Sequence, residues 1–218
     1  MNSPRICAVI TSPDLEIVRQ AELLTDLFEL RIDLLGASWE SVAKAMRMPW
    51  IATNRLSSEG GIWKDSEEKR RNELLKAIKL GASVVDIELS SPDLDEIVSQ
   101  IKKQAKCLIS WHDIKHTPPL SELHRLVENE ISYGADICKV VTTAHNTEDN
   151  LRMLELIKKF PHSQLTAFAM GSYGQLSRVL CPLYGGCFIY ASLSEGLESA
   201  SGQLSLAQMH RLYELVKT

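Results

Sequence analysis

A single-domain (β/α)8 barrel, or TIM barrel, is the fold class that the sequence predicts, and three observations support it. The chain has 218 residues, apolar strand-like runs alternate with helix-like segments along its whole length, and eight such pairs can be counted. Strands that alternate with helices form a parallel sheet with helical crossovers, and eight units allow the sheet to close on itself. We therefore expect residues 1–218 to form one barrel domain.

Each expected strand is a short apolar run bounded by polar turn residues, and each expected helix spaces its apolar residues by three or four. The expected strands lie at 5–11, 27–34, 50–55, 83–89, 107–113, 137–143, 165–170 and 188–192. The expected helices lie at 14–25, 39–46, 67–80, 94–105, 120–132, 148–160, near 173–180 and at 205–216. No linker or shift in composition divides the chain, which favours one domain.

The composition is that of an ordinary globular protein and excludes several functional classes. Hydrophobic residues make up 44% of the chain and charged residues 24%, with a net charge of -4. A nucleic-acid-binding surface would normally be basic, and no apolar run approaches the ~20 residues that span a membrane. The chain enters its first strand without a signal-peptide pattern, and the five cysteines show no Cys-x-x-Cys pair. These features predict a cytoplasmic protein with reduced thiols and no membrane or nucleic-acid partner.

Charged side chains occupy one face of several expected strands. Successive strand residues point to opposite faces, so the residues of 29, 31 and 33 share a face, as do those of 86 and 88. If the apolar faces contact the helices, the charged faces line the barrel interior, which is normally packed with branched apolar side chains. The charged residues expected in the interior are Glu29, Arg31, Arg55, Asp86, Glu88, His112 and Lys139.

Two explanations of these charges other than an active site remain open. Ion pairs such as Glu29 with Arg31, or Asp86 with Lys139, would make a purely structural lattice, although buried ion pairs rarely repay their desolvation. A solvated edge strand is the other explanation, but a closed barrel has no edge. Because active sites of this fold lie at the carboxyl ends of the strands, where several of these charges fall, we favour an active site.

Lys139 and His112 define the chemistry that this interior favours. Both lie within apolar strand-like runs, where an ammonium group is costly unless it is paired or neutralised. A lysine that gives up its proton becomes an amine nucleophile, and a histidine transfers protons near neutral pH. The pair therefore indicates imine chemistry.

The loops after the strands supply candidate anion-binding groups. Arg55 opens a loop that contains Glu59 and two glycines, and Arg178 follows the seventh strand on a short helix. The planar guanidinium group of arginine can bind both oxygens of a carboxylate. Ser199 and Gln203 lie in a small, polar segment after the eighth strand, which suits a mobile lid, although taken alone these two residues are better explained by an ordinary solvated loop.

In combination these motifs resemble the type I 3-dehydroquinate dehydratases, lyases of the shikimate pathway of aromatic amino-acid biosynthesis. The resemblance runs from about residue 5 to the C-terminus. The motifs that carry it, in order, are Glu-Leu-Arg-Ile-Asp (29–33), Arg-x-x-x-Glu-Gly-Gly (55–61), Ser-Trp-His-Asp (110–113), Lys139 in its strand, Met-Gly-x-x-Gly-x-x-Ser-Arg (170–178) and Ser-Ala-x-Gly-Gln (199–203). Two positions depart from the family pattern, since Ser201 replaces a usual proline and Ile114 a usual aromatic residue.

The resemblance implies a role for each candidate residue. Lys139 forms the imine with the ketone of 3-dehydroquinate, His112 is the general acid and base, and Glu59 orients His112. The residues implied to hold the substrate's carboxylate and hydroxyl groups are Glu29, Arg31, Arg55, Arg178, Ser199 and Gln203. The family uses no metal and no diffusible cofactor, and it is commonly homodimeric.

Three rival interpretations remain open at this point. A barrel aldolase or another Schiff-base lyase would share Lys139 and the anion-binding arginines. A non-catalytic binder of a small carboxylate would keep the pocket but would not need both Lys139 and His112. The third is a scaffold barrel whose charges form an ion-pair lattice.

Overall fold

The computed structural model describes residues 4–216, and over this range the chain forms a (β/α)8 barrel in a single domain, as the sequence predicts. Residues 1–3 and 217–218, which the predicted domain also includes, lie outside the described range. The eight strands are β1 (Ile6–Ile10), β2 (Leu27–Arg31), β3 (Trp50–Thr53), β4 (Val84–Glu88), β5 (Lys106–His112), β6 (Ile137–Thr143), β7 (Leu165–Met170) and β8 (Ile189–Ser192).

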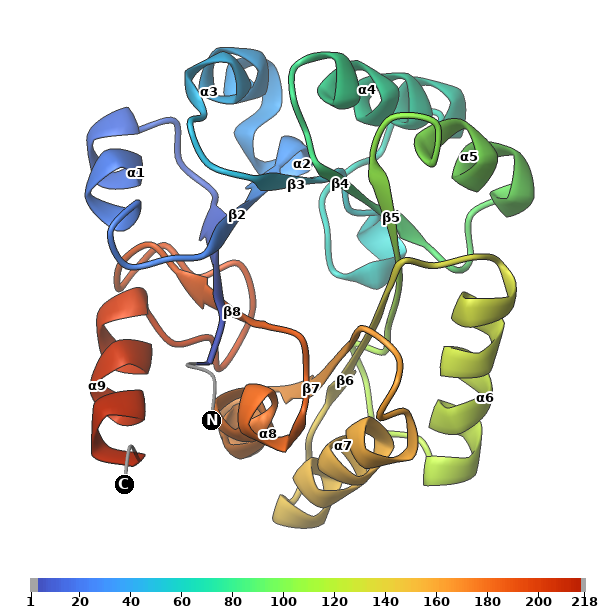
Figure 1. Ribbon diagram of the computed structural model, residues 1–218, viewed down its shortest axis with the longest axis vertical. Helices are drawn as coiled ribbons and strands as arrows, with labels where there is room; N and C mark the ends of the chain where they lie inside the picture. The colour runs from blue at the N-terminus through green and yellow to red at the C-terminus, as the bar shows by residue number, and fades with distance from the viewer. Residues whose placement is uncertain (1–3, 217–218) are drawn as a thin grey trace.

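The α-helices surround the strands as an outer ring (Figure 1). They are α1 (Leu15–Ala21), α2 (Ile32–Leu35), α3 (Trp39–Ala45), α4 (Glu67–Lys79), α5 (Leu94–Ile101), α6 (Leu120–Ser132), α7 (Thr147–Lys159), α8 (Gln175–Leu180) and α9 (Leu206–Val216). Four short 3-10 helices lie in the loops, namely η1 (Gly36–Ser38), η2 (Ser57–Glu59), η3 (Ser172–Gly174) and η4 (Pro182–Tyr184). Within residues 4–216, no helix is long and apolar enough to cross a membrane.

All pairs of neighbouring strands are parallel, in the order β7-β6-β5-β4-β3-β2-β1-β8. Between β7 and β8, which would close the barrel, the described residues form individual hydrogen bonds rather than a regular β-ladder. The backbone N–H of Cys187 donates to the carbonyl of Leu165 at 2.9 Å, and the hydroxyl of Thr166 donates to the carbonyl of Phe188 at 2.7 Å. The sheet is therefore a nearly closed cylinder, which gives every strand one face toward the interior and one toward the helices.

Local sequence signals fix several helix starts close to their predicted positions. Ser66 caps α4 by accepting from the backbone N–H of Lys69, and Asn146 with Asp149 forms a capping box at the start of α7. Acidic residues in the first turns of both helices complement the helix dipole. These caps explain why the two helices begin where the polar turns of the sequence predict.

The second strand is shorter than the sequence predicts. We expected a strand over 27–34, but β2 ends at Arg31 and the chain turns directly into the four-residue helix α2. Asp33 therefore does not share a strand face with Glu29 and Arg31, and that prediction is wrong. The tight turn brings the carboxylate of Asp33 back onto the guanidinium group of Arg31, where it accepts from Nε and Nη2 at 2.8 Å and 2.7 Å.

Glu130 of α6 is an acid whose burial should be visible in the pH dependence of stability. The residue is fully buried beside the thiol of Cys138 and the backbone of Lys139. Burial raises its pKa well above the usual value, so the unfolded chain ionises first as the pH rises. The free energy of unfolding then decreases by up to about 1.4 kcal/mol per pH unit, so the protein becomes less stable, until the folded carboxyl ionises too.

Glu130→Gln is therefore expected to become more stable relative to the wild type as the pH rises from 5 to 8. Urea unfolding at these two pH values measures the difference, with Glu122→Gln on the exposed side of the same helix as control. A difference between Glu130→Gln and wild type that stays constant across this range would contradict the expectation.

Candidate active site

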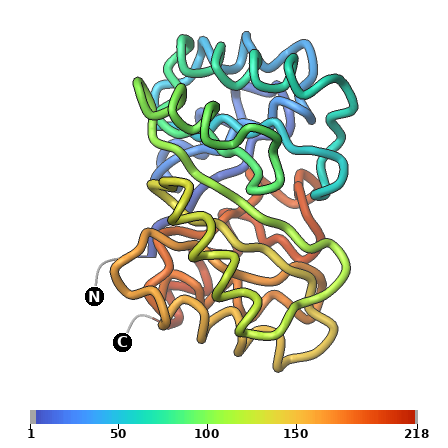
Figure 2. Tube along the Cα trace, turned by 90° about the vertical axis from the view of Figure 1, so that its right-hand side faces the viewer, coloured from blue at the N-terminus to red at the C-terminus, as the bar shows by residue number. Residues whose placement is uncertain are grey.

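A pocket opens at the carboxyl ends of the strands, and all nine residues that the sequence nominates line it. Those lining residues are Glu29, Arg31, Arg55, Glu59, His112, Lys139, Arg178, Ser199 and Gln203. Seen from the side, the segment after β3 (cyan) and the segment after β8 (orange-red) leave the barrel on the same side (Figure 2). This is the end at which active sites of the fold lie.

Lys139 lies in the barrel interior on β6 and is 4% exposed. Its Nζ donates to a carboxylate oxygen of Asp86 at 3.0 Å and to one of Glu29 at 3.2 Å. The same nitrogen lies 4.2 Å from the centroid of the Tyr190 ring. Two carboxylates and an aromatic face therefore surround this nitrogen.

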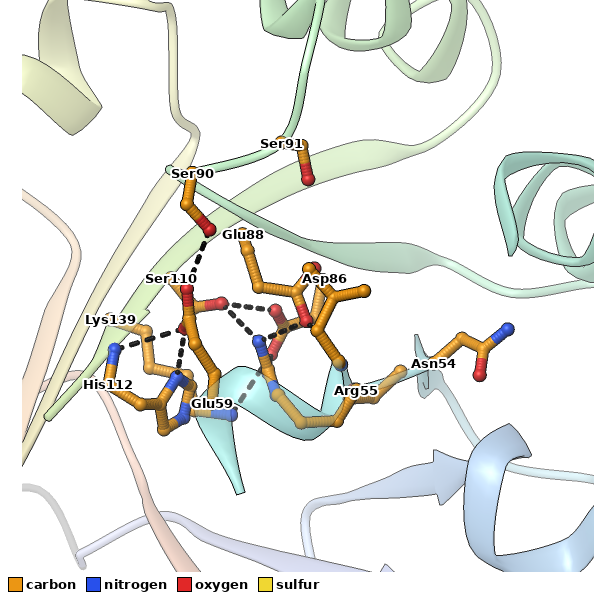
Figure 3. A network of polar contacts seen from close by, with 12 residues as sticks. Asn54, Arg55, Glu59, Asp86, Glu88, Ser90, Ser91, Ser110, His112 and Lys139 are labelled. Carbon is orange, nitrogen blue, oxygen red and sulfur yellow. Dashed lines mark hydrogen bonds and ion pairs between the residues drawn. The ribbon is translucent and has the colours of Figure 1, made fainter. Parts of the chain in front are cut away.

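Arg55 is held by a network of acids rather than left free in the pocket (Figure 3). Its Nη2 donates to Asp86 at 2.6 Å, and its Nη1 donates to Glu88 at 2.9 Å and to the hydroxyl of Ser110 at 2.7 Å. Glu88 also accepts from Arg70, a fully buried residue of α4. The alternative of an ion-pair lattice thus describes part of the site correctly, since Arg55 is tied to the barrel wall.

His112 and Glu59 form a direct pair at the pocket mouth. Nδ1 of His112 lies 3.0 Å from Oε2 of Glu59, and the backbone N–H of His112 donates to the same oxygen at 3.1 Å. Because a carboxylate only accepts, Nδ1 carries the hydrogen and Nε2 presents a lone pair. Burial, followed by the nearby charges of Arg55 and Lys139, lowers the pKa of His112 well below its usual value. These effects favour the neutral imidazole, whose Nε2 lone pair can accept a proton.

Asp33 connects two parts of the pocket. Besides its two bonds to Arg31, it accepts from the backbone N–H of Ile62 at 3.2 Å. Ile62 lies in the loop that carries Glu59, so one buried carboxylate fixes both a pocket arginine and this loop. The positions of Arg31 and Glu59 are thereby linked.

Arg178 is the pocket arginine that lacks an acidic partner among residues 4–216. It is 2% exposed, its Nε has no hydrogen-bond partner, and its Nη2 reaches only the carbonyl of Ser201 at 3.4 Å. Its guanidinium carbon lies 4.5 Å from the centroid of the Phe168 ring. Burial alone lowers the pKa of Arg178 to about 10, so the group stays charged at neutral pH. A buried, unpaired guanidinium group in a pocket is suited to binding an anion.

The segment after β8 lies across the pocket. The backbone N–H and the hydroxyl of Ser199 both donate to Oε1 of Gln203, at 2.7 Å and 3.1 Å. The carbonyl of Ser201 accepts from the backbone N–H of Gly171 at 3.0 Å. Gly202 has a φ of +75°, and a Cβ there would lie 2.3 Å from the carbonyl oxygen of Gly171, so only glycine fits. The segment is thus docked on the loop after β7.

Sequence reasoning missed two residues of the pocket wall. Tyr190 on β8 places its ring against Lys139, and Phe168 on β7 carries Arg178 on its face. Both looked like ordinary core aromatics, because the sequence shows only apolar strands at these positions. Their shared signal is the period-2 spacing along β7 and β8, which places Phe168 and Tyr190 on the interior face.

The remaining candidate chemistries find no site in the described chain. All five cysteines are free thiols, and burial raises the pKa values of Cys107 and Cys187 to about 12. Among the residues that the structure describes, no group of three or more His, Cys, Asp or Glu side chains is arranged to hold a metal ion. The reactive groups of the pocket are therefore Lys139, His112 and the acids and arginines around them.

Fold and pocket together define a class: a (β/α)8 barrel with a buried lysine in its lumen and a histidine–carboxylate pair at its mouth. The comparisons with known proteins agree with this class. A family model described as type I 3-dehydroquinase matches residues 6–218. A 3-dehydroquinate dehydratase of Dehalococcoides mccartyi is 46% identical over 217 residues, which cover 99% of this chain and 97% of the relative.

Solved structures share the fold closely. The 3-dehydroquinate dehydratase of Aquifex aeolicus VF5 has a TM-score of 0.81 at 25% identity, covering 98% of this chain and 99% of that one. The type I 3-dehydroquinate dehydratase of Clostridium difficile, solved with covalently modified comenic acid, has a TM-score of 0.86 at 24% identity and covers 99% and 93%. The chain belongs to the type I 3-dehydroquinase family. The predictions of the family, of a lyase and of the barrel fold are thereby confirmed.

Proposed function

We propose that this chain removes water from 3-dehydroquinate to give 3-dehydroshikimate, through an imine between the substrate ketone and Lys139. Family membership supports the substrate and the reaction class. The observation that carries the mechanism is the placement of a buried lysine amine, a neutral imidazole and an unpaired guanidinium group around one pocket. These groups are suited to attack a ketone, move a proton and bind a carboxylate.

The first step joins the amine to the ketone. The ammonium group of Lys139 first releases a proton, and the free amine attacks the carbonyl carbon. The carbonyl oxygen takes up that proton equivalent and leaves as water, which gives a cationic imine on the same nitrogen. Asp86 and Glu29, which contact this nitrogen, stabilise the positive charge as it forms. The ring of Tyr190 contributes in the same direction.

The second stage is proton transfer by His112. The cationic imine acidifies the neighbouring C–H bond, and the free Nε2 of His112 removes that proton to leave an enamine. The enamine expels the β-hydroxyl group, and the protonated His112 gives its proton to this leaving group, so that one water is released and the imidazole is restored. Hydrolysis of the conjugated imine then frees the product and Lys139.

Arg178 should govern the binding of the substrate carboxylate. Arg178→Ala is expected to raise KM by about 10- to 100-fold, because charge-assisted hydrogen bonds contribute about 1.5–3 kcal/mol. Arg178→Lys keeps the charge but loses the planar fork, so its KM should fall between the two. Steady-state kinetics measure the effect, with the exposed Arg125→Ala of α6 as control. Unchanged KM values in both Arg178 variants would contradict the assignment.

Glu59 should set the acid side of the pH profile. Burial raises the pKa of Glu59 to about 7, and the ionised form is the one that accepts from Nδ1 of His112. We therefore expect kcat/KM to fall about tenfold per pH unit below pH 7. Glu59→Gln should lower kcat by about 100-fold or more and remove this limb. Asp65→Asn, at an exposed carboxylate, is the control. A Glu59→Gln profile with the wild-type acid limb would contradict this prediction.

A direct assay tests the proposed reaction. When 3-dehydroquinate is added, the absorbance of the conjugated enone product should grow and the substrate should lose the mass of one water. An aldolase would instead cleave a carbon–carbon bond, and a non-catalytic binder would change neither signal. Absence of enone formation over repeated preparations of folded protein would reject the dehydratase.

Two further properties stay predictions. The resemblance implies a homodimer, which sedimentation velocity of the purified protein tests. The composition and the reduced cysteines imply a cytoplasmic location, which fractionation of the source cells tests. The mechanism itself requires no cofactor, since every step above uses side chains of this chain.

A further inference from the structure

Glu59 accepts hydrogen bonds on both of its carboxylate oxygens, and only one of these faces His112. Oε2 accepts from Nδ1 and from the backbone N–H of His112. The other oxygen, Oε1, accepts from the hydroxyl of Ser90 at 2.9 Å. Figure 3 shows the carboxylate of Glu59 between these two partners. Ser90 therefore holds the far side of the group that orients the proposed base.

Ser90 presents this hydroxyl from a turn that is fixed to the barrel. The turn follows β4 directly, where the backbone N–H of Leu89 donates to the carbonyl of Ser110 at 2.8 Å and that of Ser91 donates to the carbonyl of Glu88 at 3.0 Å. Glu59 comes from the loop after the neighbouring strand β3. The bond from Ser90 to Glu59 thus joins two loops at the pocket mouth, and a hydroxyl at position 90 has a defined target.

The bond affects the ionisation of Glu59 as well as its orientation. A hydroxyl donor stabilises a carboxylate more than a neutral carboxyl group. Burial raises the pKa of Glu59, and the bond from Ser90 opposes that rise together with the charge of Arg55. Without the hydroxyl, Oε1 loses the only side-chain donor recorded for it within residues 4–216, and the carboxyl is also freer to rotate away from His112.

We propose that Ser90 is a positioning residue of the dehydration, which acts through Glu59 by keeping that carboxylate ionised and turned toward Nδ1 of His112. The inference deepens the proposed function and rests on it, because it concerns the base of that reaction. Among the described residues no hydrogen bond joins Ser90 to Lys139 or His112, so its effect should appear in the pH dependence rather than in the formation of the imine.

The test compares Ser90→Ala with Ser90→Thr, which keeps a hydroxyl group. The acid limb of kcat/KM should move upward by about 0.5–1 pH unit in Ser90→Ala, while Ser90→Thr keeps the wild-type limb. Above this limb, kcat of Ser90→Ala should stay within about threefold of the wild type. Ser91→Ala is the matched control, because its hydroxyl accepts from Arg70 and does not contact Glu59.

A second measurement tests the role of Ser90 without substrate turnover. The imidazole nitrogen shifts of His112, followed by NMR in the full chain without substrate, should report the ionisation of Glu59 near pH 7. That midpoint should move upward in Ser90→Ala and stay in place in Ser90→Thr and Ser91→Ala. A midpoint and an acid limb that are both unchanged in Ser90→Ala would overturn the proposal. If the chain shows no dehydratase activity, the NMR titration alone decides the role of Ser90, so the two failures are distinguishable.

Discussion

Lys139→Ala is expected to abolish both turnover and covalent trapping of the substrate. The primary amine is the nucleophile of the proposed mechanism, and no other lysine lines the pocket among the described residues. Loss of a covalent nucleophile costs on the order of 10⁵-fold or more in kcat. Reduction with borohydride in the presence of 3-dehydroquinate should then give no adduct, as judged by intact-protein mass.

Removal of Lys139 also leaves Asp86 and Glu29 without the cation that they share. A second variant that keeps the positive charge is therefore needed beside Lys139→Ala. Breaking a buried ion pair destabilises a protein by about 3–5 kcal/mol. Lys139→Arg keeps a positive charge beside both acids but cannot form the imine. It should fold with near wild-type stability and remain inactive, whereas Lys106→Ala, at an exposed position of β5, should keep full activity. Turnover in folded Lys139→Arg would contradict the mechanism.

His112→Ala separates the two stages of the reaction. General acid–base catalysis contributes about 10²–10⁴-fold, so kcat should fall by at least this range. The imine does not need Nε2 of His112 for its positive charge, which Asp86 and Glu29 stabilise. We therefore expect the borohydride adduct to form in His112→Ala and to accumulate, because the trapped imine is no longer consumed by dehydration.

Trapping and turnover must therefore respond differently to the loss of His112. Single-turnover kinetics and the mass of the reduced protein measure the two stages on the same sample. The control is His116→Ala, since this histidine is largely exposed and pairs with Asp113 outside the pocket. If His112→Ala loses the adduct to the same extent as it loses turnover, the assignment of separate roles is incorrect.

The alternation of strands and helices was predictable because it depends on local patterns. Apolar runs such as 107–113 and 137–143 are short and sharply bounded, and they agree with β5 and β6 within one residue. The prediction failed at 27–34, where β2 ends at Arg31 and α2 begins. The bidentate pair of Arg31 and Asp33 spans that break, and hydrophobic periodicity does not reveal such a contact.

The residues that line the pocket were also predictable, because parallel strands bring their carboxyl ends to the same end of the barrel. The partners within the pocket were not predictable in the same way. Of the two ion pairs that the sequence suggests, Asp86 with Lys139 forms. Glu29 with Arg31 does not, because Glu29 pairs with Lys139 and Arg31 pairs with Asp33. Strand pairing fixes which residues face the interior, but the choice of ion-pair partner depends on side-chain reach across the barrel.

Two contacts from outside the strands escaped the sequence entirely. Arg70 lies in a charged run of α4 that looks like a solvated helix face, yet it is fully buried and bonded to Glu88. Ser90 lies in a polar turn, and its contact with Glu59 joins residues 31 positions apart. Neither position has a local pattern that distinguishes it from an ordinary surface residue, so only the folded chain identifies them.

Mass spectrometry of the borohydride-treated protein tests the central claim most directly. The wild-type chain is incubated with 3-dehydroquinate, reduced, weighed intact and then digested to locate the modified residue. The account predicts a mass gain of one reduced substrate- or product-derived adduct, mapped to Lys139. An active enzyme that gains no mass, or that carries the adduct on another lysine, would contradict it.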